Sequence, residues 1–157
     1  MTTERTVVLA RHGEAMSTSE SFERPLTIVG RQHSERMASW LESSGYRVDE
    51  IVHSEKLRAR QTAKIFGRRL GLHAAKVHEA PHLNPGDDPV HLADTIETDR
   101  RSVMVVGHLP FLARLASVLL VGDPNLLQIG FVEAGVVVLT RERGGWQVDA
   151  AANFNVV

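Results

Sequence analysis

The chain has 157 residues, and its 18 lysines and arginines against 19 aspartates and glutamates give a formal net charge of −1. This length predicts a single domain over residues 1–157, with enough buried surface for a core that needs no disulfides. The balanced charge argues against a nucleic-acid-binding or membrane-surface protein. The absence of cysteine excludes disulfides and cysteine-ligated metal sites.

The N-terminal residues Met1–Arg5 are not followed by the apolar segment of a signal peptide, so we expect none. No apolar run approaches the length of a membrane-spanning helix. Together with the lack of cysteine, this fits a cytoplasmic protein.

Six short segments rich in β-branched and apolar residues predict strands. Residues 103–106 read Val-Met-Val-Val, apolar at every position, which is typical of a central strand covered on both faces. In chain order the predicted strands are Thr6–Ala10, Glu50–His53, Lys76–His78, Ser102–Val106, Val136–Thr140 and Trp146–Ala150.

Four helices are expected between these strands, from apolar residues at helical spacing and from start and stop signals. Gly45, Gly71 and Gly122 follow the first, second and fourth helix. Asp88 is expected to cap the third, with Pro89 at its first helical position. The predicted helices are Val29–Ser44, Lys56–Leu70, Pro89–Thr98 and Pro110–Val121.

The alternation of strands and helices predicts an α/β fold: a three-layer α/β/α sandwich around a mostly parallel sheet. The last two strands flank Arg141–Gly145, where Gly144-Gly145 indicates a hairpin turn. We therefore expect them to form an antiparallel edge. Residues 80–89 hold three of the six prolines and predict a loop near a strand end.

The stretch Arg11-His12-Gly13-Glu14 follows the first buried strand directly. Ligands of open α/β sheets bind at the carboxyl ends of strands. A neutral imidazole is able to attack phosphorus and become phosphohistidine, and a neighbouring arginine favours a phosphoryl group. An isolated Arg-His-Gly is more often part of a surface turn.

A second candidate element runs from Ser54 to Ala63, beginning where the second strand ends and opening a helix. Helix N-termini attract anions, and Arg58 lies in the first turn. Alone, the segment also fits a solvated cationic helix.

The third element, Gly107-His108-Leu109-Pro110, again places a histidine where an apolar strand ends. With Arg11, His12 and Arg58 it would gather two histidines and two arginines on one rim of the sheet. Such a set suits phosphoryl transfer without a metal, because arginine and imidazolium neutralise phosphoryl oxygens. We expect no metal and no cofactor. His78 and His82 are four apart, but Pro81 between them argues against a helical metal pair.

These motifs, in this order, resemble the histidine phosphatase (phosphoglycerate mutase-like) superfamily, from Val7 to about Thr140. The resemblance implies a phosphoglycerate mutase-like fold and a metal-independent phosphatase. It implies that His12 is the nucleophile and that Arg11, Arg58 and His108 bind the phosphoryl oxygens. Arg24 and Ser54 correspond to residues near the phosphate.

The compact length and the segments Arg24-Pro25-Leu26-Thr27 and Leu83-Asn84-Pro85-Gly86-Asp87 resemble the SixA-type phosphohistidine phosphatases. His82 stands about where that branch tends to have the glutamate that protonates the leaving group. Glu79 and Asp87 are the remaining candidates for this acid. A weak acid favours phosphohistidine over a phosphoester, because imidazole is the easier leaving group.

Three functions follow as hypotheses. The first is dephosphorylation of phosphohistidine in a signalling protein, such as a histidine phosphotransfer domain. The second is a phosphatase of a small phosphorylated metabolite. The third is a module that binds phosphorylated partners with little turnover, although a pure binder has no need of His12. Neither a nucleic acid nor a membrane is expected as a partner.

Overall fold

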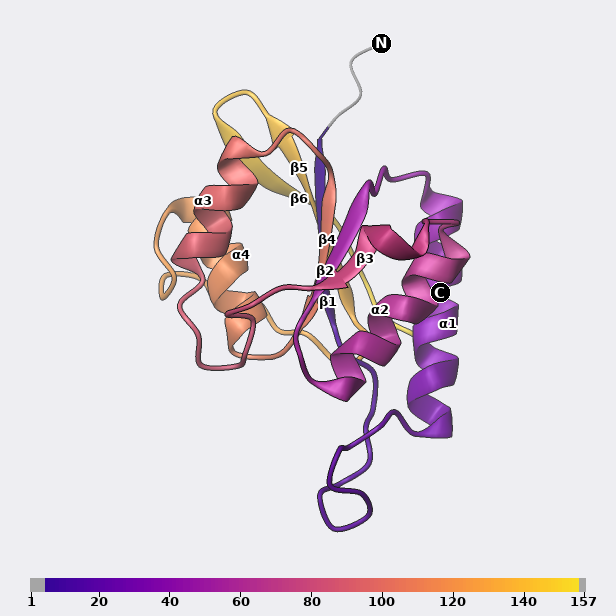
Figure 1. Ribbon diagram of the computed structural model, residues 1–157. Helices are drawn as coiled ribbons and strands as arrows, with labels where there is room; N and C mark the ends of the chain where they lie inside the picture. The colour runs from indigo at the N-terminus through magenta and orange to yellow at the C-terminus, as the bar shows by residue number, and fades with distance from the viewer. Residues whose placement is uncertain (1–4, 156–157) are drawn as a thin grey trace.

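The computed structural model describes residues 5–155 (Figure 1). Strands and helices alternate up to the fourth helix, and two strands follow it. In chain order the elements are β1 (Thr6–Arg11), α1 (Ile28–Ser44), β2 (Glu50–His53), α2 (Leu57–Arg69), the 3₁₀ helix η1 (Ala74–Lys76), β3 (Val77–Glu79), α3 (Val90–Thr98), β4 (Val103–Gly107), α4 (Phe111–Val121), β5 (Val136–Glu142) and β6 (Gly145–Ala152).

All six strands form one sheet in the order β3-β2-β4-β1-β5-β6. The first four strands pair in parallel, whereas β5 is antiparallel to β1 and β6 is antiparallel to β5. The expected mostly parallel α/β fold with antiparallel strands at one edge is thus confirmed. In the central pair, Arg11 at the end of β1 lies opposite Gly107 at the end of β4, so these two strands finish level.

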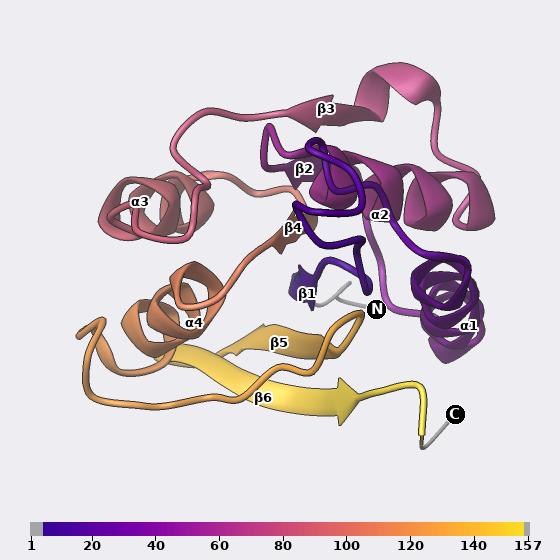
Figure 2. The same ribbon diagram turned by 90° about the horizontal axis from the view of Figure 1, so that it is seen from below.

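Helices cover both faces of the sheet (Figure 2). On β1, Val7 and Leu9 belong to the apolar core under α3 and α4, while Val8 and Ala10 belong to the core under α1 and α2. Both faces of this strand are therefore buried, which explains why its sequence is continuously apolar instead of alternating. The result is the three-layer sandwich that the sequence predicted.

Helix boundaries follow the predicted signals to within about one residue. Thr27 caps α1, its hydroxyl accepting a hydrogen bond from the amide of Gly30 at 2.9 Å. Gly45 ends the same helix in the left-handed conformation, with φ of 77°. At α3 the expected capping residue was wrong by one position. Pro89 is the cap, and Asp88 contributes a carboxylate that accepts from the amide of Val90 at 3.0 Å.

Two further details differ from the predictions. Lys76 was expected to begin β3 but belongs to η1. The amide of Ala75, the second residue of η1, donates to the ring of His73 at 3.1 Å. The hairpin loop is shorter than Arg141–Gly145, because Glu142 still pairs with Gly145. The turn therefore lies one residue earlier than expected, at residues 143–144.

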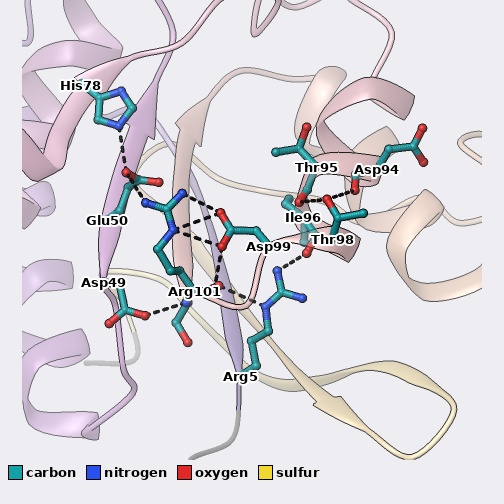
Figure 3. A network of polar contacts seen from close by, with 11 residues as sticks. Arg5, Asp49, Glu50, His78, Asp94, Thr95, Ile96, Thr98, Asp99 and Arg101 are labelled. Carbon is teal, nitrogen blue, oxygen red and sulfur yellow. Dashed lines mark hydrogen bonds and ion pairs between the residues drawn. The ribbon is translucent and has the colours of Figure 1, made fainter.

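A polar network ties together the amino-terminal ends of β2 and β4 (Figure 3). One carboxylate oxygen of Glu50 accepts from Arg101 at 3.2 Å and lies 3.1 Å from the imidazole of His78. Arg101 also pairs with Asp99 at 2.7 Å, and its guanidinium lowers the pKa of that carboxyl to about 2. These contacts connect neighbouring strands at one end of the sheet. The carboxyl ends of β1, β2 and β4 lie at the opposite end.

Within residues 5–155, no helix combines the length and the apolar character needed to cross a bilayer.

Candidate active site

The predicted site residues gather at the carboxyl edge of the sheet. His12 directly follows β1, Ser54 directly follows β2, and His108 directly follows β4. Because β1 and β4 are parallel neighbours that end level, their two histidines meet: the ring centroids lie 5.2 Å apart and the planes are tilted by 56°. Parallel pairing thus brings together residues that are 96 positions apart in the sequence.

The ring of His12 is buried and held in one orientation. Its Nδ1 lies 2.7 Å from the carbonyl oxygen of Gly13, which accepts only, so Nδ1 carries the proton. The backbone amide of His12 donates to Gly107 at 3.0 Å, and its carbonyl accepts from Ala134 at 3.0 Å. The remaining ring nitrogen, Nε2, therefore has a lone pair, which is the form a nucleophile requires.

The surroundings of His12 favour its neutral form. Burial lowers its pKa from 6.5 to about 4, and the positive charges of Arg58, Arg11 and Arg24 act in the same direction. The hydrogen bond to Gly13 opposes this shift but does not outweigh it. At pH 7 the imidazole is therefore neutral and faces several fixed cations.

His108 is also buried, and it is bonded to Ser54. Its Nε2 lies 2.7 Å from Oγ of Ser54, which in turn accepts from the amide of Lys56 at 3.1 Å. When the serine hydroxyl donates to Nε2, the proton of His108 sits on Nδ1. That Nδ1 is buried and has no partner among the described residues. Burial, together with His12 and the nearby cations, lowers the pKa of His108 to about 3.

Three arginines near His12 lack carboxylate partners. Within the described part of the chain, Arg11, Arg24 and Arg58 take part in no ion pair. The Nε atoms of Arg11 and Arg58 are buried without hydrogen-bond partners, and burial lowers the pKa of Arg58. Arg11 donates through another guanidinium nitrogen to the carbonyl of Phe131 at 3.0 Å. Buried donors are normally satisfied, so two unbonded Nε atoms beside two neutral histidines indicate a binding site for an anion.

Arg24 reaches the site from the loop between β1 and α1. Its backbone has a φ of 52°, and its Nε donates to the carbonyl of Met16 at 2.9 Å. Arg24 and Arg58 line the same cavity, which measures about 600 Å³ and is completed by residues Phe22, Glu23, Glu55, Lys56, Leu57 and Arg60. Arg24 thus lies close enough to His12 and Arg58 for its charge to lower the pKa of both groups.

The first turns of α2 hold the loop of His12 in place. The amide of Gly13 donates to Oγ of Thr62 at 3.0 Å, and this hydroxyl donates to the carbonyl of Arg58 at 2.9 Å. The side chain of Gln61 accepts from the amide of Leu26 at 2.7 Å. No role was expected for Thr62 or Gln61, although both lie in the candidate element from Ser54 to Ala63.

The two acids expected from the sequence lie in different surroundings. Glu79 is exposed and lines a second cavity, of about 340 Å³, next to the first. Asp87 lines neither cavity, and its carboxylate accepts from the amide of Asn84 at 2.8 Å, which fixes a local turn. A third acid, Glu55, was missed: it lines both cavities and accepts from the side chain of Asn84 at 3.1 Å.

Comparisons with known proteins agree with this geometry. A model of the histidine phosphatase superfamily (branch 1) matches residues 7–84. Phosphohistidine phosphatase SixA of Escherichia coli is 28% identical over 152 residues, which cover 90% of this chain and 92% of the relative. The chain belongs to the histidine phosphatase superfamily. It is accordingly a phosphatase, and within the superfamily it is similar to SixA.

Two solved structures have the same fold. A structure of SixA complexed with tungstate superposes with a TM-score of 0.81 at 27% identity, covering 96% of this chain and 97% of the other. A mycobacterial glucosyl-3-phosphoglycerate phosphatase in complex with VO₃ has a TM-score of 0.71 at 20% identity, covering 93% and 98%. The second similarity shows the fold alone.

Proposed function

We propose that this histidine phosphatase works through a phosphohistidine intermediate on His12, without a metal. The main supporting observation is the state of the His12 ring. It is a neutral imidazole with a free Nε2 lone pair, and it lies near three arginines that form no ion pair with a described carboxylate. In the first step Nε2 attacks phosphorus while the bond to the leaving group breaks. In the second step water attacks the phosphohistidine, which releases inorganic phosphate and restores His12.

In this proposal Arg11, Arg58 and His108 bind the phosphoryl oxygens, and Arg24 adds positive charge at the cavity mouth. The cations that lower the pKa of His12 and His108 are compensated when a phosphoryl group of about −2 charge binds. The buried Nδ1 of His108 and the free guanidinium nitrogens supply donors that are already in place.

The substrate we propose is phosphohistidine in a signalling protein, such as a histidine phosphotransfer domain. Two observations support it: the similarity to SixA along most of both chains, and the exposed setting of Glu79 together with the local role of Asp87. Phosphohistidine breaks at a P–N bond, and its imidazole leaving group takes a proton from solvent without an enzyme acid. The cytoplasmic location expected from the sequence remains part of this proposal.

A small phosphorylated metabolite is the second candidate substrate, because the fold is shared with a glucosyl-3-phosphoglycerate phosphatase and Glu55 borders the cavity. Under this alternative, Glu55 or Glu79 protonates a phosphoester oxygen. A binding module with little turnover is less favoured, since it has no use for the free Nε2 of His12.

The test begins with hydrolysis of an aryl phosphate in the presence of EDTA. We expect turnover that EDTA leaves unchanged and that His12→Ala abolishes. Activity in His12→Ala, or full dependence on a divalent ion, contradicts the mechanism. Comparison of a histidine-phosphorylated phosphotransfer domain with a panel of phosphorylated metabolites then decides the substrate class: the higher kcat/KM is expected for the phosphoprotein.

A further inference from the structure

One exposed aromatic side chain lines the cavity that contains two of the arginines near His12. Phe22 lies in the loop between β1 and α1, and 87% of its surface is accessible to solvent. It lines the same cavity as Arg24 and Arg58. We propose that this loop is a docking element for a phosphorylated protein, with Phe22 as its apolar anchor. This proposal rests on the proposed function and assigns the partner-binding surface of the same site.

The loop is built to hold this position. It projects beyond the carboxyl edge of the sheet, between β1 and α1 (Figure 1). Its two arms are joined by the bridge between Ala15 and Leu26 and by the hydrogen bond from the amide of Met16 to Pro25 at 2.8 Å. At the tip, the amides of Glu20 and Ser21 both donate to the carbonyl of Ser17. An ordered loop that keeps a phenyl ring in water loses little conformational entropy when a partner covers the ring.

The charges around Phe22 indicate an acidic partner surface. The cavity lining holds four cations, Arg24, Lys56, Arg58 and Arg60, against two carboxylates, in a chain whose formal net charge is −1. In the proposed chemistry Arg58 binds the phosphoryl group itself. Arg60 is exposed on the outer side of α2. A phosphorylated side chain surrounded by aspartates and glutamates complements this arrangement, because opposite potentials speed encounter and fix orientation.

The exposure of Phe22 favours a protein over a small metabolite. A metabolite small enough to lie inside a cavity of about 600 Å³ leaves most of the outward-facing phenyl ring in water. A protein surface seated on the cavity mouth is able to cover the ring. Aromatic side chains covered in this way often dominate the binding energy of an interface.

The experiment compares two substrates with the same P–N bond: a histidine-phosphorylated phosphotransfer domain and the free amino acid phosphohistidine. For Phe22→Ala we expect kcat/KM to fall about tenfold for the phosphoprotein, through KM, and to change less than twofold for free phosphohistidine. Arg60→Ala is expected to lower only the phosphoprotein rate, and added salt is expected to reduce that difference.

The matched control is Leu126→Ala. This side chain is 66% exposed and follows the C-terminus of α4, a helix that starts beside His108 and runs back along the sheet. It should leave both rates unchanged. Equal losses for both substrates with Phe22→Ala, or no loss with either, overturn the docking proposal while leaving the chemistry at His12 standing. A wild-type enzyme that hydrolyses neither form of phosphohistidine but hydrolyses a metabolite overturns the proposed substrate and, with it, this inference.

Discussion

Nε2 of His108 lies 2.7 Å from Oγ of Ser54, so the ends of β4 and β2 are joined by a side-chain hydrogen bond inside the site. Because Ser54 also accepts from the amide of Lys56 at the start of α2, the serine connects a strand end, a helix start and an imidazole. In the proposed mechanism this bond keeps the proton of His108 on Nδ1, where it serves as a donor to the phosphoryl group.

Loss of the Ser54 hydroxyl should therefore weaken catalysis. For Ser54→Ala we expect kcat/KM toward an aryl phosphate to fall about tenfold, which corresponds to about 1.4 kcal/mol, because a buried hydrogen bond is removed and the orientation of His108 is released. Ser117→Ala is the matched control: its buried hydroxyl bonds to the carbonyl of Asp123, away from the site. If Ser54→Ala keeps the wild-type rate, His108 does not depend on this contact.

Two of the three buried histidines, His12 and His108, should make folding stability depend strongly on pH. Both have pKa values lowered from 6.5, to about 4 for His12 and about 3 for His108. Between these values and 6.5 the unfolded chain binds more protons than the folded one, so the free energy of unfolding falls as the pH falls. From pH 7 to pH 5 each histidine is expected to contribute a loss of about 2 kcal/mol.

Urea unfolding at pH 7 and pH 5 measures this loss. His108→Asn removes one of the buried titrating groups, so the stability of this variant should fall less over the same interval. The exposed His91 on α3 provides the control, and His91→Asn should follow the wild type. A wild-type protein equally stable at both pH values would show that the histidines titrate normally in the fold.

Arg58 should be required for binding a tetrahedral oxyanion. Tungstate was bound in a solved structure of SixA that is 27% identical to this chain. At a concentration 100 times its Kd, such an anion stabilises the folded state by about 2.7 kcal/mol, which raises Tm by about 5 °C or more. Thermal unfolding should show this shift in the wild type and in Arg60→Ala but not in Arg58→Ala. If Arg58→Ala keeps the Tm shift, the anion binds at a site that does not include Arg58.

Gly30 in α1 should not accept even a methyl group. A Cβ at this position would collide with the carbonyl of Glu14, in the loop that follows His12. We expect Gly30→Ala to destabilise the fold by about 2 kcal/mol or more, although alanine is the better helix former by about 1 kcal/mol. Gly130 has open space around its Cα, so Gly130→Ala should change stability by less than about 0.5 kcal/mol in chemical denaturation. Equal stability of the two variants would contradict the close contact between Gly30 and the carbonyl of Glu14.

Much of the fold was predictable because the apolar patterns and the turn residues of the sequence match the buried segments and the helix ends of the structure. The apolar run 103–106 became the central strand, and Gly45 ends α1 as expected. Positioning His12 and His108 at strand ends was enough to place them on one edge. The sequence was less informative where tertiary contacts or side-chain hydrogen bonds determine the start of an element. For example, the ring of His73 stabilises a 3₁₀ turn, so β3 begins later than its apolar pattern predicted.

The finer parts of the site were beyond sequence reasoning for a similar reason. The bond between Ser54 and His108 joins residues 54 positions apart, and no local pattern reports it. Glu55 reads as an ordinary exposed residue near a helix start until the loop carrying Asn84 folds beside it. The exposure of Phe22 depends on the hydrogen bonds that shape its loop, whereas its residue type alone predicts burial.

The central claim is that a phosphoryl group passes through His12, and the most direct test is to trap it there. The enzyme is mixed with an aryl phosphate in EDTA, quenched during turnover and digested, and the phosphate is located by mass spectrometry under alkaline conditions that preserve phosphohistidine. The mechanism predicts phosphate on the imidazole of His12 and none on His12→Ala, which is inactive. Turnover by His12→Ala, or phosphate trapped at another residue during wild-type turnover, contradicts it.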